Sequence, residues 1–199
     1  RKESSAASDV YKRQPQRRKR VIIVGEKKTD SPLKFSYPKP STKKISVRDT
    51  IGHLPATPKN GKEHPDIKHH RSDKLSDLNV KRIKYVKEGQ GMAFLPEHLL
   101  ADCHKAGADK IGHRNVYGRM KWDDVAPTIT ARFDSFTRGM FGHPEQNRTI
   151  SLREGALLQT FPNDFEFVGN KVDIARQIGN AVPVNLAVAV GKELIKALK

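Results

Sequence analysis

Residues 176–191 read RQIGNAVPVNLAVAVG, and the apolar spacing that begins in this stretch is the strongest structural signal in the chain. After Pro183, apolar residues recur at every fourth position, which predicts a helix over about residues 183–198 with the proline near its first turn. The four residues that define this face are Leu186, Val190, Leu194 and Leu198. Such a face needs a sheet to pack against, so the stretch favours an α/β domain.

Two other segments have the pattern of strands. Residues 21–24 (VIIV) are a short β-branched run ended by Gly25, which predicts a buried strand. Residues 125–133 (VAPTITARF) combine apolar and β-branched positions and predict a second strand. These are too few strands for a complete sheet, so we expect the chain on its own to leave an apolar face and open strand edges exposed.

Two short helices are expected ahead of the last one. Ser151 is followed three residues later by Glu154 and then by an apolar run, which is the capping-box arrangement of a helix start. We expect this helix to end at Pro162. A further helix is predicted over residues 172–178, stopping at Gly179.

Charge and composition narrow the class of partner. The 199 residues include 38 Lys and Arg against 22 Asp and Glu, a net charge of +16 at neutral pH, and most of the excess lies in the first hundred residues. A partner with many negative charges is the natural inference. No run of about 18 apolar residues suggests a membrane span. The single cysteine, Cys103, allows neither an internal disulfide nor a cysteine-rich metal site, so we expect no metal and a reducing cytoplasm.

The middle of the chain has an irregular composition. Seven of the twelve prolines fall between residues 26 and 118 among scattered Lys, His and Ser, so this stretch is interpreted as a small basic module with few long elements. Residues 45–51 and 76–86 are each either helical or extended. The adjacent pair His69 and His70 lies in polar surroundings and is interpreted as exposed to solvent.

Three small constellations carry the chemical information. Gln16, Arg18 and Arg20 are spaced by two and would share one face of an extended segment, where guanidinium groups suit an anionic or hydrogen-bond-rich ligand. Residues 127–130 (PTIT) and 179–183 (GNAVP) follow in order, the second as a turn before a helix N-terminus that could hold a polar ligand. Taken singly, each also fits a plain explanation: a solvated basic run, a β-branched strand and a helix cap.

In this order and at these distances, the constellations resemble the C-terminal portion of a DNA (cytosine-5)-methyltransferase over roughly residues 15–199. The resemblance implies an α/β fold: the C-terminal part of a Rossmann-like S-adenosylmethionine-dependent methyltransferase domain, joined to a small irregular α+β target-recognition domain. Residues 15–26 would be a strand of the catalytic domain, 27–118 the target-recognition domain and 119–199 the returning part of the catalytic domain. Residues 1–14 are predicted to be a disordered or artefactual tail.

The resemblance also implies roles for particular residues. Gln16, Arg18 and Arg20 match the QxRxR pattern, in which the last arginine lies against a cytosine flipped out of duplex DNA. Asn180 and Ala181 match positions that contact the cofactor, S-adenosylmethionine. Architectural roles, holding the two domains together, would fall to Arg119, Pro127, Thr128 and Thr130.

The sequence departs from the family in one large respect. The glycine-rich cofactor loop, the Pro-Cys nucleophile motif and the Glu-Asn-Val motif all precede QxRxR in the family, and this chain contains none of them. Cys103 follows Asp102 rather than a proline and falls inside the recognition segment, so it is no substitute. We therefore expect a methyltransferase fragment, inactive alone, whose partners are double-stranded DNA and the missing N-terminal half. The alternatives are a non-catalytic DNA-binding subunit of a split methyltransferase and a basic RNA-binding protein.

Overall fold

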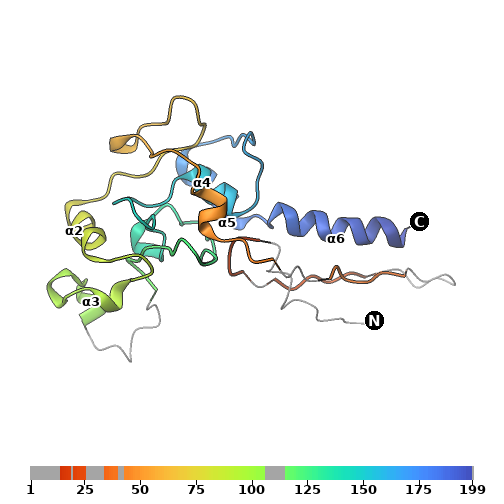
Figure 1. Cartoon of the computed structure of the whole chain (residues 1–199), viewed down its shortest axis with the longest axis horizontal. Helices are drawn as coiled ribbons and strands as arrows, with labels where there is room; N and C mark the ends of the chain where they lie inside the picture. Colours follow the sequence, from red (N-terminus) through yellow and green to blue (C-terminus); the bar gives the residue numbers. More distant parts are fainter. Residues whose placement is uncertain (1–13, 19, 26–33, 40–42, 106–114, 199) are drawn as a thin grey trace.

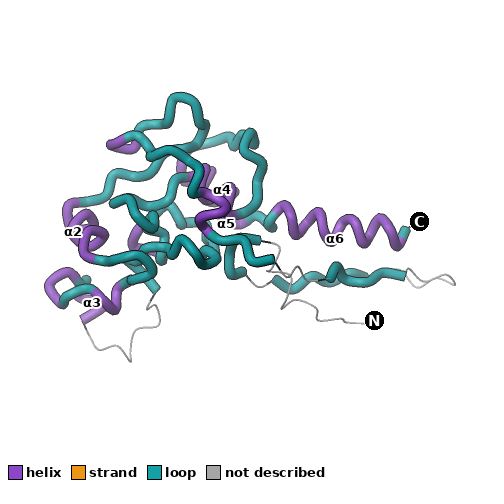
Figure 2. Tube along the Cα trace, in the orientation of Figure 1, coloured by secondary structure: helices purple, strands orange, loops and turns teal. Residues whose placement is uncertain are grey.

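The computed structural model describes residues 14–18, 20–25, 34–39, 43–105 and 115–198. Helices supply the regular structure of this part of the chain (Figure 1 and Figure 2), joined by long loops and short 3₁₀ turns. The helices are α1 (Val47–Ile51), α2 (Asp77–Tyr85), α3 (Asp102–Lys105), α4 (Leu152–Leu158), α5 (Lys171–Asn180) and α6 (Val184–Ala197). The 3₁₀ turns are Lys59–Gly61, Met92–Phe94, Glu97–Leu99 and Phe136–Arg138.

Neither predicted strand forms within the described residues. The run at 21–24 is not a buried strand, since Val21 is 75% exposed and Ile23 is 81% exposed. The segment around Ala126 makes only an isolated parallel bridge to Gln16, with Arg17 N donating to Ala126 O over 2.8 Å. A parallel strand exists only through hydrogen bonds to its neighbours, and in this part of the chain the neighbours are not there. The α/β prediction is therefore not realised as a sheet within these residues.

The predicted helices are present, with corrections at their ends. The capping box of α4 is complete, with Ser151 accepting from Glu154 N and the Glu154 carboxylate accepting from Ser151 N. The helix ends before Pro162 because Thr160 adopts a left-handed conformation (φ 62°) and Phe161 N donates back to Ala156 O over 3.0 Å. This is a Schellman ending with threonine in the place usual for glycine.

Gly179 does not stop α5 as expected, because the helix continues through Asn180. Its role is to allow a close approach between two segments. A Cβ atom at this position would lie 2.2 Å from the carbonyl carbon of Thr130 and 2.3 Å from Ala131 N. Glycine is therefore required for α5 to rest on the backbone of residues 130–131, rather than for a left-handed turn.

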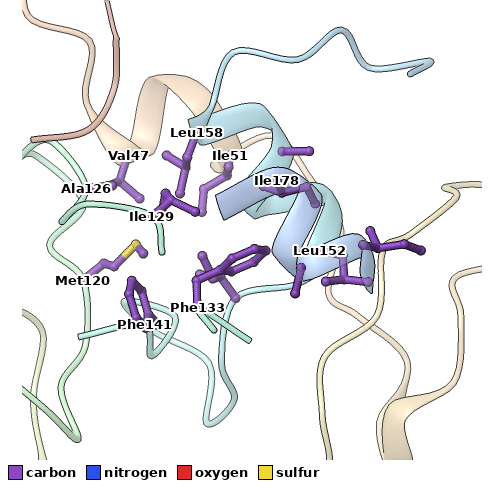
Figure 3. Close-up of a cluster of buried hydrophobic side chains, with 14 of the residues drawn as sticks. Val47, Ile51, Met120, Ala126, Ile129, Phe133, Phe141, Leu152, Leu158 and Ile178 are labelled. Carbon is purple, nitrogen blue, oxygen red and sulfur yellow. The ribbon is translucent and has the colours of Figure 1, made fainter. Parts of the chain in front are cut away.

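The first of two cores gathers around α4 and α5. Its apolar side chains come from α1, from residues 120–150 and from both of these helices (Figure 3). Phe133 and Ile178 are completely buried there, and Gly155 of α4 leaves room for the Phe133 ring. Val47 and Ile51 of α1 belong to the same core. The predicted division at residue 118 stays a prediction, but α1, from the 27–118 range, packs with the C-terminal segment.

The second core lies beside α2 and includes Ile83, Val86, Leu95, Leu99, Tyr117 and Phe136. The Arg82 guanidinium stacks over the Tyr117 ring at 4.3 Å, and Tyr117 itself has a positive φ of 53°. The described residues thus contain two separate apolar clusters.

Two features project from this body in the same direction (Figure 1): helix α6 and the arm, which we define as residues 20–25 and 34–39. The two halves of the arm are joined by Tyr37 Oη, which donates to Ile22 O over 2.9 Å. On α6, Leu186 is buried, whereas Ile195 is 58% exposed and Leu198 is 72% exposed. Among the described residues, no single helix is long and apolar enough to cross a bilayer, although α5 and α6 satisfy the length and composition test as a pair bent by 41°.

Candidate functional site

The predicted row of Gln16, Arg18 and Arg20 is present, and its first member is fully buried. Gln16 Oε1 accepts from Ile129 N over 2.9 Å, and Gln16 Nε2 donates to Gln159 Oε1. Gln14, placed in the tail by the sequence analysis, is also buried and donates to Arg18 O over 2.9 Å. Ordered structure thus includes residue 14, whereas residues 1–13 lie outside the described residues.

Arg18 joins two segments that are far apart in the sequence. Its Nη1 atom donates to Ile129 O over 3.0 Å and to Gly179 O over 2.6 Å. The first acceptor lies in the PTIT segment and the second in the GNAVP segment. All three constellations singled out in the sequence therefore meet at one guanidinium group.

Arg20 extends the row towards the end of α5. Its Nη2 atom donates to Ala181 O, while its buried Nε has no hydrogen-bond partner among the described residues. Burial lowers the pKa of Arg20 below its ordinary value, and the nearby charge of Arg18 lowers it further. Two like charges held side by side against backbone carbonyls form a positive surface suited to an anionic or acceptor-rich ligand.

The positions expected to contact a cofactor lie next to this row. Asn180 is the last residue of α5, and its side chain is exposed. Ala181 follows in an extended conformation, with its N–H donating to Ile178 O over 3.3 Å. Asn180 thus belongs to the C-terminal end of one helix rather than to a turn at the N-terminus of the next, and only residues 181–183 link α5 to α6.

Arg119 connects the two cores. The buried guanidinium donates five hydrogen bonds and has no carboxylate among its hydrogen-bond acceptors. The acceptors are Ile83 O and Val86 O at the end of α2, and His143 O, Gln146 O and Asn147 Oδ1 in the loop before α4. Burial lowers the pKa of Arg119. A planar group with fixed donors can lock two backbone segments at one angle, which a hydrophobic contact alone does not do.

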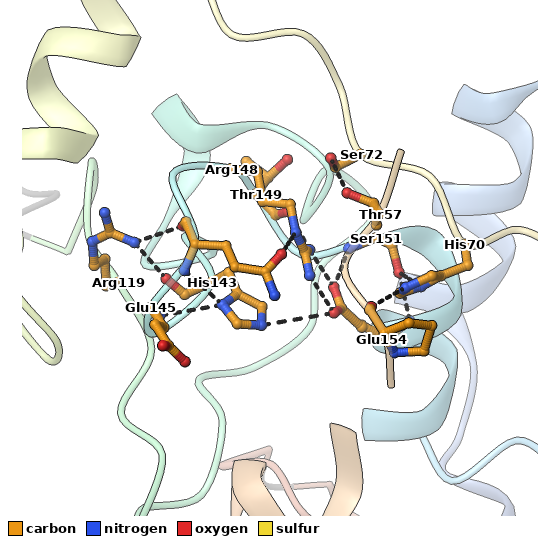
Figure 4. Close-up of polar contacts among 12 residues, drawn as sticks. Thr57, His70, Ser72, Arg119, His143, Glu145, Arg148, Thr149, Ser151 and Glu154 are labelled. Atoms are coloured by element: carbon orange, nitrogen blue, oxygen red, sulfur yellow. Dashed lines mark hydrogen bonds and ion pairs between the residues drawn. The ribbon is translucent and has the colours of Figure 1, made fainter. Parts of the chain in front are cut away.

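A buried polar network continues from this point to the N-terminus of α4 (Figure 4). The Arg148 guanidinium pairs with both carboxylate oxygens of Glu154 at 2.7 Å. Burial opposes ionisation of Glu154, but this pair, with Ser151 N at 2.6 Å, keeps its pKa below the ordinary value. His143 Nδ1 accepts from Gln146 N over 2.9 Å, and burial, with the charge of Arg148, lowers the pKa of His143 to about 4.

His70 corrects the interpretation of the histidine pair as exposed. His70 is fully buried, with Nε2 2.8 Å from Pro55 O and Nδ1 2.9 Å from Ser151 Oγ. Because the carbonyl oxygen only accepts, Nε2 carries the proton and Nδ1 accepts from the serine hydroxyl. His69 is half-buried and its Nε2 accepts from Phe167 N over 3.1 Å. The neighbouring lysines favoured the interpretation of an exposed pair, because the partners of these contacts lie far away in the sequence.

Two further features of the described part of the chain are its metal-ligating side chains and its cysteine. No group of three or more His, Cys, Asp or Glu side chains there is placed to hold a metal ion. Cys103 is a free thiol, exposed on α3. In Figure 1, α3 lies at the opposite end of the molecule from α6.

The sequence and fold were compared with known proteins. The family model for C-5 cytosine-specific DNA methylases matches residues 8–196, and the chain belongs to this family. Type II methylase M.HgiDII of Herpetosiphon aurantiacus is 41% identical over 190 residues, covering 93% of this chain and 51% of the relative. Type II methyltransferase M.PspPI of Psychrobacter sp. (strain TA137) is 32% identical, covering 95% of this chain and 44% of the relative.

A solved structure of a DNA methyltransferase is similar to this chain in fold. A DNA modification methyltransferase encoded within a prophage of E. coli matches with a TM-score of 0.55 and 22% identity. The match covers 83% of this chain and 51% of that one. The fold is therefore that of part of a DNA methyltransferase, and the chain spans about half the length of the curated relatives named above.

Proposed function

We propose that the chain is the C-terminal portion of a DNA (cytosine-5)-methyltransferase, which transfers a methyl group from S-adenosylmethionine to C5 of cytosine in a specific duplex sequence. The observation that carries the proposal is the meeting of three segments at Arg18, whose Nη1 contacts Ile129 O and Gly179 O. The segment that carries Arg18 is separated from the other two by more than a hundred positions and by the whole basic module. Membership of the family supports the same conclusion.

Arg20 is the residue that we assign to the flipped base. Its Nη2 is anchored on Ala181 O, while its Nε keeps an unused buried donor. A buried donor without a partner costs about 1–3 kcal/mol, so an acceptor such as the ring carbonyl of cytosine is favoured at this place. There the guanidinium would stabilise the negative charge that develops on the ring after nucleophilic attack. Gln16 and Arg18 would hold the row in position.

Asn180 and Ala181 are proposed as contacts to S-adenosylmethionine, which supplies the methyl group when bound. The exposed side chain of Asn180 is accessible to a ligand, which fits this assignment. Ala181 would contact the base side of the site as well as the cofactor, since its carbonyl oxygen already accepts a hydrogen bond from the Arg20 guanidinium. The base side and the cofactor side would thus be joined through a single peptide unit.

DNA recognition is proposed for residues 27–118. The whole chain carries a net charge of +16, which suits a polyanionic duplex, and base edges rather than phosphates would set the sequence preference. Arg119 would hold this part against the catalytic part through its five hydrogen bonds. Pro127, Thr128 and Thr130 would have architectural roles in the same junction. The Thr128 hydroxyl donates to Arg17 O, a contact between the two segments that we assign to the catalytic domain.

The nucleophile and the carboxylate of the reaction would come from an N-terminal half that docks on α6 and the arm. The family reaction needs a thiolate attacking C6 of cytosine and a carboxylate near N3, and this chain has no Pro-Cys or Glu-Asn-Val motif. The exposed apolar side chains of Val21, Ile23, Ile195 and Leu198 suit burial against such a partner. The type II relatives favour a restriction-modification setting, in which a bacterial or phage-encoded enzyme acts in the cytoplasm.

A reconstitution experiment tests this proposal. Methyl transfer from labelled S-adenosylmethionine to duplex DNA is measured for the chain alone and for the chain joined to an N-terminal half that carries the Pro-Cys and Glu-Asn-Val motifs. We expect no transfer by the chain alone and transfer by the completed enzyme, with Arg20→Ala lowering kcat at least about a hundredfold. Transfer by the chain alone would overturn the assignment of the nucleophile. Duplex binding without transfer in the completed enzyme would favour the alternative, a non-catalytic DNA-binding subunit.

A further inference from the structure

Gln159 is a residue to which the sequence analysis assigned no role. It is the capping residue at the C-terminal end of α4 and is completely buried. Its side-chain Nε2 donates to Ile178 O over 2.7 Å, and its side-chain Oε1 accepts from Gln16 Nε2. Its backbone oxygen accepts from Val184 N over 3.3 Å. One residue thus contacts the start of the arginine row, the end of α5 and the start of α6.

The direction of these side-chain hydrogen bonds is fixed at both ends. Ile129 N can only donate, so Gln16 turns Oε1 towards it and Nε2 towards Gln159. Ile178 O can only accept, so Gln159 turns Nε2 towards it and Oε1 towards Gln16. The two amides therefore form a single directed chain from the PTIT segment to the end of α5, in which neither amide can flip without losing a buried hydrogen bond.

This amide chain runs beside the contacts of Arg18. Both link the PTIT segment to the end of α5: the amides from Ile129 N to Ile178 O, and Arg18 from Ile129 O to Gly179 O. The amide chain therefore sets the separation that the Arg18 guanidinium has to span. Displacements of about 1 Å at such a point are enough to lower the rate of a positioned reaction.

We propose that Gln159 is a positioning residue, which acts through Gln16 to hold the arginine row at a fixed distance from the turn after α5. Its contribution to methyl transfer rests on the proposed function, whereas its effect on Gln16 does not. The proposal separates Gln159 from an ordinary buried residue, because it predicts a change at the amide of Ile129, to which Gln159 is linked by hydrogen bonds through Gln16.

The first test is hydrogen exchange in the full chain, read at the backbone amide of Ile129. We expect Gln159→Met to speed this exchange by about tenfold, since Gln16 Nε2 loses its nearer acceptor and keeps only the longer contact with Leu158 O at 3.5 Å. The double variant Gln16→Met with Gln159→Met should exchange no faster than Gln16→Met alone, because both act on one chain. The matched control is Ile150→Val, which loosens the same core without touching either amide. An Ile129 rate in Gln159→Met equal to that of the control would overturn the proposal.

The second test uses the enzyme completed with an N-terminal half. Gln159→Met should lower kcat about tenfold while changing KM for DNA by less than about threefold, and Ile150→Val should leave both unchanged. Equal kcat values for Gln159→Met and the control would refute the effect on the reaction. If the completed enzyme with the natural sequence transfers no methyl group, the proposed function fails, and hydrogen exchange at Ile129 still decides the role of Gln159.

Discussion

Acidification should destabilise the folded chain through His143. Nδ1 of this ring accepts from Gln146 N over 2.9 Å and from Glu145 N over 3.2 Å, so a proton on Nδ1 would face two backbone donors. Burial, reinforced by the charge of Arg148, lowers the pKa of His143 from 6.5 to about 4, although Glu154 opposes the shift. The folded chain therefore holds this ring neutral under conditions where the unfolded chain protonates it.

The sign and size of the effect follow from that difference. The stability contributed by the neutral ring is complete above pH 6.5 and is lost progressively as the pH falls towards 4. With 1.36 kcal/mol for each pKa unit, the total loss is about 3 kcal/mol. His143→Asn keeps an acceptor near the position of Nδ1 and removes the titration, so its stability should vary less over this interval by the same amount.

Urea unfolding at stepwise pH values between 7 and about 4 measures both profiles. His53, which is exposed, provides the control: His53→Asn introduces the same residue at the surface and should leave the profile of the natural sequence in place. His70 contributes in the same direction, because burial lowers its pKa too, so His143→Asn should flatten the curve without making it level. Parallel profiles for the natural sequence and His143→Asn would refute the argument.

Three other outcomes are expected. Gly179→Ala should lower the Tm, because its Cβ would lie 2.2 Å from the Thr130 backbone. Gly191→Ala is the control: a Cβ there has nothing within 4 Å, so this variant should gain up to about 1 kcal/mol of stability. An equal gain in stability for both variants would contradict the close approach at Gly179. Arg119→Met should cost several kcal/mol in chemical denaturation, since five acceptors lose their donor, and a loss below about 1 kcal/mol would argue against its role as the link between the cores. Duplex binding followed by fluorescence anisotropy should weaken with added KCl by about 0.9 in log affinity per log salt for each phosphate neutralised. A slope near zero would speak against electrostatic DNA recognition.

Helices with local signals could be predicted from the sequence. The capping box at Ser151 and Glu154 marked the start of α4, and the four-residue spacing after Pro183 marked α6. These signals lie within one or two turns of the chain, so no distant partner is needed to satisfy them. The end of α4 was predicted less well, because Thr160 takes a left-handed conformation that the sequence does not indicate.

Strands and buried polar residues were predicted less well, for a common reason. The run at residues 21–24 has strand composition, but a strand also requires a hydrogen-bonded neighbour, which the described part of the chain does not supply. His70 was taken as exposed because its partners, Pro55 and Ser151, are distant in sequence. Gln159 was given no role, since one glutamine after an apolar run is an ordinary pattern until its contacts are known.

The meeting of the three constellations could not be derived from the residues alone. Composition favoured a solvated basic run for residues 16–20, yet Gln16 is fully buried and Arg18 reaches two other segments. Long-range contacts of this kind leave no periodic trace in the sequence. Order and spacing along the chain were the only guide.

The guanidinium groups of Arg18 and Arg20 donate hydrogen bonds to main-chain carbonyl oxygens. Every residue of a protein has such an oxygen. Anchorage of this kind is indifferent to the identity of the side chain at the accepting position. Evolution can therefore exchange residues such as Ala181 without releasing the arginines, provided that the path of the main chain is kept. A saturation library of the chain would then show two intolerant arginines and a more tolerant position 181, whereas packing restricts the other two acceptor positions, Gly179 and the buried Ile129.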